Sequence, residues 1–61
     1  MSDYVKVNDD GDGEVIVESE EGSIDILYYH DSVHQKKVRN KAEKIAEKKA
    51  KELNCDWGTN Y

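Results

Sequence analysis

The chain has 61 residues, with 14 acidic and 9 basic side chains and a formal net charge of −5 at pH 7. A chain of this length forms one domain at most and buries a modest part of its surface, so dimerisation or docking on a larger partner would stabilise it. The single cysteine excludes an intrachain disulfide framework and a multi-cysteine zinc site, which is typical of a reducing cytosol. The longest uninterrupted apolar run, Ile26 to Tyr29, has four residues, so we expect a cytoplasmic protein without a signal peptide or a membrane span.

Three short stretches alternate between apolar and polar residues, as strands do. They cover Asp3–Asn8, Glu14–Ser19 and Ser23–Tyr29, and glycine-containing turns separate them. We therefore expect a three-stranded antiparallel meander of two hairpins over residues 3–29. Its inner face would consist of aliphatic side chains and one tyrosine: Val5, Val7, Val15, Val17, Ile24, Ile26 and Tyr28.

The next stretch, residues 32–53, has the pattern of one amphipathic helix. Ser32 and Gln35 have the spacing of a capping box, and Asn54 suits the left-handed conformation that ends many helices. At about 100° per residue, one stripe of this helix is apolar. The stripe contains Val38, Ala42, Ile45, Ala46, Ala50 and Leu53. Lys49 inside the stripe and Arg39 at its edge are expected to cover the core with their methylenes and to keep their charges in water.

Together these elements predict an α+β fold. A three-stranded antiparallel meander is followed by one long C-terminal helix packed on one face of the sheet, in the order β-β-β-α. Residues 54–61 would form a short tail after the helix, and the whole chain, residues 1–61, would be a single domain.

The charge is divided between the two halves of the chain. Residues 1–31 carry ten acidic side chains against the single base Lys6, hence −9, whereas residues 32–61 carry eight basic against four acidic side chains, hence +4. Five lysines recur along the solvent side of the predicted helix and form a lysine ridge: Lys37, Lys41, Lys44, Lys48 and Lys51. A solvated helix face accounts for such a pattern, and a surface for phosphates or an acidic partner is the alternative. The ridge lacks the aromatic and arginine side chains that recognise bases.

The sheet face opposite the helix has no predicted element left to cover it. By alternation it would expose apolar and aromatic side chains with carboxylates at their border: Tyr4, Ile16, Leu27 and Tyr29, with Glu14, Glu18 and Asp25. So many large apolar side chains on an open face indicate a partner-binding surface with tyrosine anchors and a charged rim. The alternative is that the C-terminal tail, with Trp57 and Tyr61, folds back over part of this face.

Acidic turns would extend the same surface: Asp9, Asp10, Asp12, Glu20 and Glu21. The first of these turns also matches the opening of an EF-hand calcium loop, with oxygen ligands at the first, third and fifth positions, a glycine at the sixth and an aliphatic residue at the eighth. Those positions are Asn8, Asp10, Asp12, Gly13 and Val15. However, the first ligand is neutral and Ser19 stands where a bidentate glutamate belongs. The tip of a hairpin explains the stretch better, and we expect no metal site there.

No catalytic constellation is present. Ser32 and His34 flank a helix start, where neighbours in sequence do not adopt the geometry of a triad. The carboxylates lie on turns and on an open face, without a cleft that would raise a pKa. His30 and His34 are four residues apart, but His30 precedes the helix, and nothing in the spacing brings Cys55 to them. We therefore expect a non-enzymatic protein without a cofactor.

A dense set of carboxylates on a sheet can present a negative surface to a protein that normally holds nucleic acid. In size, acidity and lack of catalytic residues, the chain resembles small phage-encoded inhibitors of host defence, including anti-CRISPR proteins of the DNA-mimic type. The resemblance implies an inhibitor in the host cytoplasm whose partner is a nucleic-acid-binding protein complex. Two alternatives stay open: a small nucleic-acid-binding or regulatory module that uses the lysine ridge, and a homodimeric domain. Direct nucleic-acid binding is not expected, because the −9 half repels phosphates.

Overall fold

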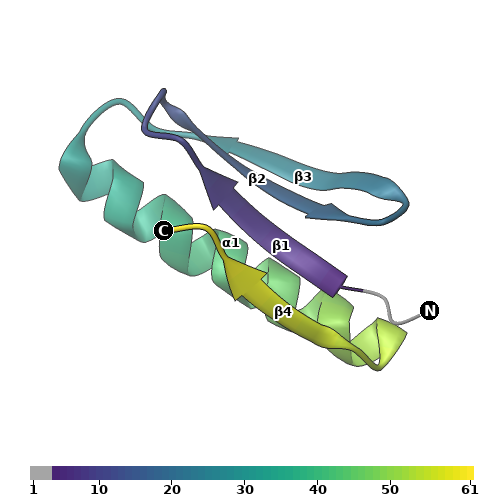
Figure 1. The fold of residues 1–61 in the computed structure, drawn as a ribbon. Helices are drawn as coiled ribbons and strands as arrows, with labels where there is room; N and C mark the ends of the chain where they lie inside the picture. Colours follow the sequence, from purple (N-terminus) through teal and green to yellow (C-terminus); the bar gives the residue numbers. More distant parts are fainter. Residues whose placement is uncertain (1–3) are drawn as a thin grey trace.

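Alternating residues form three strands, and the long periodic stretch forms one helix, as the sequence predicts. The computed structural model describes residues 4–61, so Asp3, the first residue of the predicted sheet region, lies outside them. The antiparallel meander consists of β1 (Tyr4–Asp9), β2 (Glu14–Ser19) and β3 (Gly22–Tyr28). The helix α1 (Ser32–Leu53) packs along one face of the sheet (Figure 1), which confirms the predicted α+β fold.

The predicted tail contains a fourth strand, β4 (Asp56–Thr59). It pairs in parallel with β1, so the sheet order is β3-β2-β1-β4 and β4 runs along the near edge of the sheet in Figure 1. Asn54 makes this return possible, because its left-handed conformation (φ 54°) ends the helix and reverses the chain. The strand pairs the backbone groups along the free edge of β1, which would otherwise need water. The prediction of a simple tail was therefore wrong. The strand was missed because the sequence DWGT has little strand propensity of its own.

Valines from the two inner strands meet alanines from the helix in the core. Val5, Val7, Val15 and Val17 are fully buried, and they are covered by the alanines of the predicted stripe: Ala42, Ala46 and Ala50. The larger members of that stripe, Val38, Ile45 and Leu53, pack around this centre, which confirms the predicted stripe. Small alanine side chains allow the helix backbone to approach the sheet closely. Each fully buried valine contributes about 1.5–3 kcal/mol, so this core is small and the domain depends on every element that covers it.

A β-bulge in β3 changes which residues face the helix. Val17 lies opposite Asp25, whereas the next residue, Glu18, lies opposite Ser23, so Ile24 is an extra residue in the ladder. One extra residue shifts the alternation of the strand by one position and exchanges its two faces.

The prediction for the faces of β3 was therefore wrong beyond Ile24. Ile24 does pack against the core, but it is followed by Leu27 and Tyr29 on the helix side. Ile26 and Tyr28, predicted to be inside, lie opposite Ile16 and Glu14 and are 41% and 68% exposed.

The two ends of α1 differ in how well the sequence predicts them. The start is capped by Asp31, whose side chain accepts a hydrogen bond from the backbone N–H of His34, and the expected capping box of Ser32 and Gln35 is absent. Gln35 instead reaches the sheet, where its side-chain amide donates a hydrogen bond to the carboxylate of Asp9. The end at Leu53, with Asn54 in the left-handed conformation, is as predicted.

The close contact between helix and sheet leads to a test of the core. Ala46→Leu should lower the free energy of unfolding by about 1–3 kcal/mol, because extra methylenes in a filled core force the helix away from the valines. Urea unfolding followed by circular dichroism measures this change. The matched control, Lys44→Leu on the exposed side of the same helix, should stay within about 0.5 kcal/mol of the unmodified protein. Equal losses in both variants would contradict the proposed packing.

Candidate interaction surface

The surface of the sheet away from the helix is here called the outer sheet face. Directly opposite residues on neighbouring strands share a face of the sheet, so the partners of the buried valines face the helix. Side chains alternate along a strand, so the residues between those positions face outward. They are Tyr4, Lys6, Asn8, Glu14, Ile16, Glu18, Ile26, Tyr28, Asp56 and Gly58. The one helix of residues 4–61 lies on the other side, so no helix or strand of the described chain covers this face (Figure 1).

Exposed aromatic and aliphatic side chains lie on this face. Tyr4, Ile26 and Tyr28 are 47%, 41% and 68% exposed, and Ile16 is half-buried between its neighbours on β1 and β3. The side chain of Tyr4 extends from β1 across the backbone of β4, and its hydroxyl occupies the space that a Cβ atom at Gly58 would need. A glycine at this position therefore leaves room for the tyrosine ring.

Carboxylates accompany these apolar side chains. Asp56 lies directly opposite Tyr4, and Glu14 lies directly opposite Tyr28, so each exposed tyrosine of this face has a carboxylate as its cross-strand neighbour. Glu18 lies opposite Lys6, which is the single base of the face.

These carboxylates keep their negative charge available to a partner. Glu18 accepts a hydrogen bond from the side-chain amide of Asn8. Within residues 4–61, no ion pair joins Glu14, Glu18 or Asp56 to a lysine or an arginine.

The structure brings together most of the predicted partner-binding residues. Tyr4, Glu14, Ile16 and Glu18 share the outer sheet face. Asp25 is exposed, but it lies opposite the buried Val17 and therefore on the helix side of the sheet, so its predicted place on the outer face was wrong. Leu27 and Tyr29 do not belong to this face, since both pack against the core. Ile26 and Tyr28 take their places, and Asp56 is added by β4. Nothing in the local sequence marks the bulge that makes this exchange.

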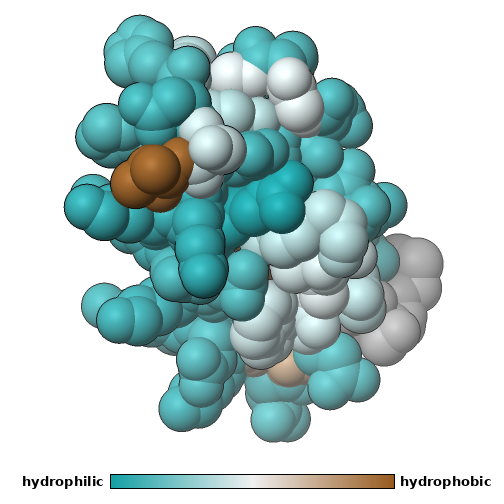
Figure 2. All heavy atoms as spheres, turned by 90° about the vertical axis from the view of Figure 1, so that its left-hand side faces the viewer, coloured by the Kyte–Doolittle hydropathy of each residue, from teal (hydrophilic) through white to brown (hydrophobic). Residues whose placement is uncertain are grey.

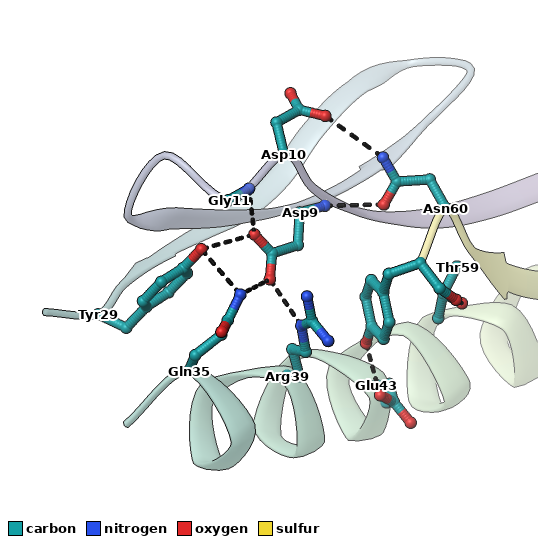
Figure 3. A network of polar contacts seen from close by, with 10 residues as sticks. Asp9, Asp10, Gly11, Tyr29, Gln35, Arg39, Glu43, Thr59 and Asn60 are labelled. Atoms are coloured by element: carbon teal, nitrogen blue, oxygen red, sulfur yellow. Dashed lines mark hydrogen bonds and ion pairs between the residues drawn. The ribbon is translucent and has the colours of Figure 1, made fainter. Parts of the chain in front are cut away.

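Beneath one end of the sheet, a buried carboxylate joins the sheet to the helix (Figure 3). Asp9, predicted to be an acidic surface residue, is the last residue of β1 and is only 7% exposed. Its carboxylate accepts hydrogen bonds from Tyr29 Oη at 2.8 Å, Gln35 Nε2 at 3.0 Å, the backbone N–H of Gly11 at 2.9 Å and Arg39 Nε at 2.6 Å. The outer surface at this end of the molecule is largely hydrophilic (Figure 2), and the Asp9 carboxylate lies beneath it.

These contacts determine how Asp9 titrates. Burial alone would raise the pKa of its carboxyl group, but the hydrogen bonds from Gly11, Arg39, Gln35 and Tyr29 outweigh it and hold that pKa well below its usual range. Burial and the bond to the Asp9 carboxylate raise the pKa of Tyr29. Arg39 therefore forms an ion pair with the buried Asp9 carboxylate, while 32% of its side chain stays exposed.

The C-terminal residues complete this network and leave the outer sheet face open. The side-chain oxygen of Asn60 accepts a hydrogen bond from the Asp9 N–H at 2.8 Å. Arg39 lies 4.2 Å above the ring of Tyr61, whose hydroxyl donates to Glu43 Oε2 at 2.5 Å. Trp57 packs against the core. The two aromatic residues that were considered as a cover for the outer face thus contact the helix side of the sheet.

The other acidic turn residues stay at the surface. Asp10, Asp12, Glu20 and Glu21 are exposed, and Asp10 receives a 3.4 Å hydrogen bond from Asn60 Nδ2. Within residues 4–61, no group of three or more His, Cys, Asp or Glu side chains is arranged to hold a metal ion.

The two histidines lie at the start of α1, and the cysteine follows its other end. His34 Nδ1 lies 2.9 Å from the carboxylate of Asp31 at the helix start, and His30 is exposed. Cys55 packs against the core at the other end of α1.

Comparisons with protein families, with characterised proteins and with solved structures found no match to this chain. Among the described residues, no helix has the length and apolar character that crossing a membrane requires.

The Asp9 network predicts a specific response to acid. Because the pKa of Asp9 is lowered in the folded protein, its contribution to stability is complete above the ordinary aspartate pKa of about 3.9 and is lost as the pH falls below it. Asp9→Asn should lower the free energy of unfolding at pH 7 by about 1–3 kcal/mol and make its decrease between pH 5 and pH 2 shallower. Urea unfolding at a series of pH values measures both effects. Asp12→Asn, at an exposed turn position, should keep the original profile, and an unchanged profile in Asp9→Asn would contradict the role of the network.

Proposed function

We propose that this protein is a non-catalytic inhibitor whose outer sheet face occupies the nucleic-acid-binding surface of a partner protein. One observation carries the proposal: exposed tyrosines stand beside carboxylates that have no ion pair to a base within residues 4–61, on a sheet face that no described element covers. A face of this composition suits a basic partner. The anti-CRISPR-like, phage-encoded class of DNA mimics is the group of inhibitors that this proposal favours.

The spacing of the acidic side chains supports a polyanion-like surface. Glu14 and Glu18 are four positions apart on β2, which is about 13 Å along the strand, and neighbouring strands add charges at steps of about 4.8 Å. Asp56 on β4 adds a further carboxylate to the same face. A groove that binds nucleic acid gains most of its affinity from phosphate contacts, and carboxylates on this grid would use the same lysines and arginines.

Charge alone gives attraction without selectivity, so the apolar part of the face is needed as well. Tyr4 on β1 and Tyr28 on β3 are the exposed aromatic anchors. Ile16 lies on β2 between these two strands, directly opposite Ile26 on β3. Tyrosines in the centre of an interface commonly carry a large share of its binding energy. Lys6 would be placed against an acidic group of the partner.

The lysine ridge supports a second candidate function, because its five lysines are exposed and only Lys51 has an ion pair within the described chain, with Glu47 at 3.7 Å. A nucleic-acid-binding module that uses this ridge would work against the net charge of −5. It would also lack aromatic and arginine contacts to bases. For these reasons the outer sheet face is preferred.

The proposal is tested by capture on the immobilised protein. A nuclease-treated bacterial extract is passed over the protein at physiological salt, and bound proteins are identified by mass spectrometry, with and without duplex DNA as competitor. We expect a nucleic-acid-binding protein that duplex DNA displaces. Replacing Glu14, Glu18 and Asp56 by Gln, Gln and Asn should reduce its capture by about tenfold or more, since exposed charge pairs contribute up to about 1 kcal/mol each.

Matched controls separate this face from the rest of the charge. A variant with Asp12→Asn, Glu20→Gln and Glu21→Gln loses the same number of charges at the turns and should keep most of the capture. Lys41→Gln with Lys44→Gln and Lys48→Gln should leave it unchanged. Loss of capture in the lysine variant alone, together with direct binding of duplex DNA, would favour the second candidate function. If the sheet, turn and lysine variants all capture the partner as well as the unmodified protein does, both candidate functions are rejected.

A further inference from the structure

The outer side of α1 and the outer sheet face carry opposite charges on opposite sides of one molecule. The alanine stripe faces the sheet, so the lysine ridge faces away from it. Within residues 4–61, Lys37, Lys41, Lys44 and Lys48 have no ion pair. The carboxylates of the outer sheet face likewise have no ion pair to a base in the described chain. Two charged surfaces of one chain thus remain without an internal counterpart.

We propose that the lysine ridge of one copy docks on the outer sheet face of a second copy. The chemistry of the sheet face suits ammonium groups, because the pairs Tyr4–Asp56 and Tyr28–Glu14 each combine a carboxylate with an aromatic ring. A carboxylate attracts the lysine charge directly, and the ring adds a cation–π contact. The lysine methylenes would cover the aliphatic side chains between these two pairs.

The dimensions of the two surfaces agree. Asp9 is paired with Val15, so Glu14 is level with position 10 of the neighbouring strand. The Tyr4–Asp56 and Tyr28–Glu14 pairs are thus six positions, or about 20 Å, apart along the strands. Lys37 and Lys51, at the two ends of the lysine ridge, are fourteen positions apart on α1, which is about 21 Å. One ridge can therefore reach both tyrosine–carboxylate pairs.

Two copies with a net charge of −5 repel each other at long range, whereas the lysine ridge and the outer sheet face attract each other at contact. The ionic strength decides whether the repulsion or the attraction is larger. At about 0.1 M salt the Debye length is about 10 Å. The two shorter dimensions of the molecule are 17 and 16 Å, so the far face of each copy is screened while the touching faces are not. Salt near 1 M shortens the Debye length to about 3 Å and weakens the contact itself.

Because the two faces lie on opposite sides of the molecule, each copy can contact one neighbour with its helix and another with its sheet. Such a heterologous contact forms open stacks instead of a closed dimer. The stack would cover the same outer sheet face that the proposed function assigns to a partner. It needs no other protein, however, so it holds or fails independently of the capture experiment.

Sedimentation equilibrium of the nuclease-treated full chain tests the proposal. At about 0.1 M salt, the weight-average mass should increase with protein concentration to about twice the 7.0 kDa of the monomer or more, and about 1 M salt should return it to 7.0 kDa. A mass that stays at 7.0 kDa under all conditions would overturn the proposal.

Two neutralised variants make the test specific. The sheet variant carries Glu14→Gln and Asp56→Asn, and the ridge variant carries Lys37→Gln, Lys41→Gln, Lys44→Gln and Lys48→Gln. Each variant alone should remain a monomer, because one of the two contacting faces is missing. An equimolar mixture should form a heterodimer of twice the 7.0 kDa monomer mass and nothing larger, since only one intact ridge and one intact sheet face meet.

A turn variant with Glu20→Gln and Glu21→Gln serves as the control and should associate like the unmodified protein. Circular dichroism confirms that all variants are folded. Association of either neutralised variant alone, or a mixture without a heterodimer, would overturn the proposal. The proposal would also be overturned if the protein stayed monomeric and bound duplex DNA in a salt-sensitive way through the lysine ridge. That result would assign the ridge to nucleic-acid binding.

Discussion

The close approach of α1 to the sheet is the contact on which the rest of the structure depends. Ala42, Ala46 and Ala50 bring the helix backbone against fully buried valines, and the larger side chains of the core pack around this centre. A single helix can cover one face of this sheet only. The open outer sheet face is therefore a direct consequence of how the core is built.

The two layers of the fold carry charges of opposite sign on their outer sides. Lysines occupy the outer side of the helix, and carboxylates occupy the outer side and turns of the sheet. The pair of Asp9 and Arg39 is the one ion pair of residues 4–61 that joins the sheet to the helix. Because several hydrogen bonds satisfy Asp9, this pair anchors the end of β1 to the helix without leaving a charge uncompensated. Lys37, Lys41, Lys44 and Lys48 on the helix and Glu14, Glu18 and Asp56 on the sheet have no ion pair within residues 4–61.

The candidate surface was predictable where it depends on strands of regular alternation. Tyr4 and Lys6 face away from Val5 and Val7, and the same pattern turns Glu14, Ile16 and Glu18 outward on β2. Alternation failed in β3, because one extra residue in the ladder exchanged Leu27 and Tyr29 for Ile26 and Tyr28. It also could not show that Asp56 joins the face, since β4 acquires its position only by pairing with β1.

The sequence by itself determined the limits of α1, the alanine stripe, the valine face of β1 and β2, and the separation of acidic and basic halves. These features depend on neighbours a few residues apart, whose spacing is visible in the chain. Tertiary structure alone decided the bulge at Ile24, the position of β4 and the burial of Asp9. Each of these depends on partners far away in sequence: Asp9 is bonded to residues 20, 26 and 30 positions away, and its backbone N–H to one 51 positions away. A buried charge or a free strand edge must find such partners, and local periodicity does not encode which ones.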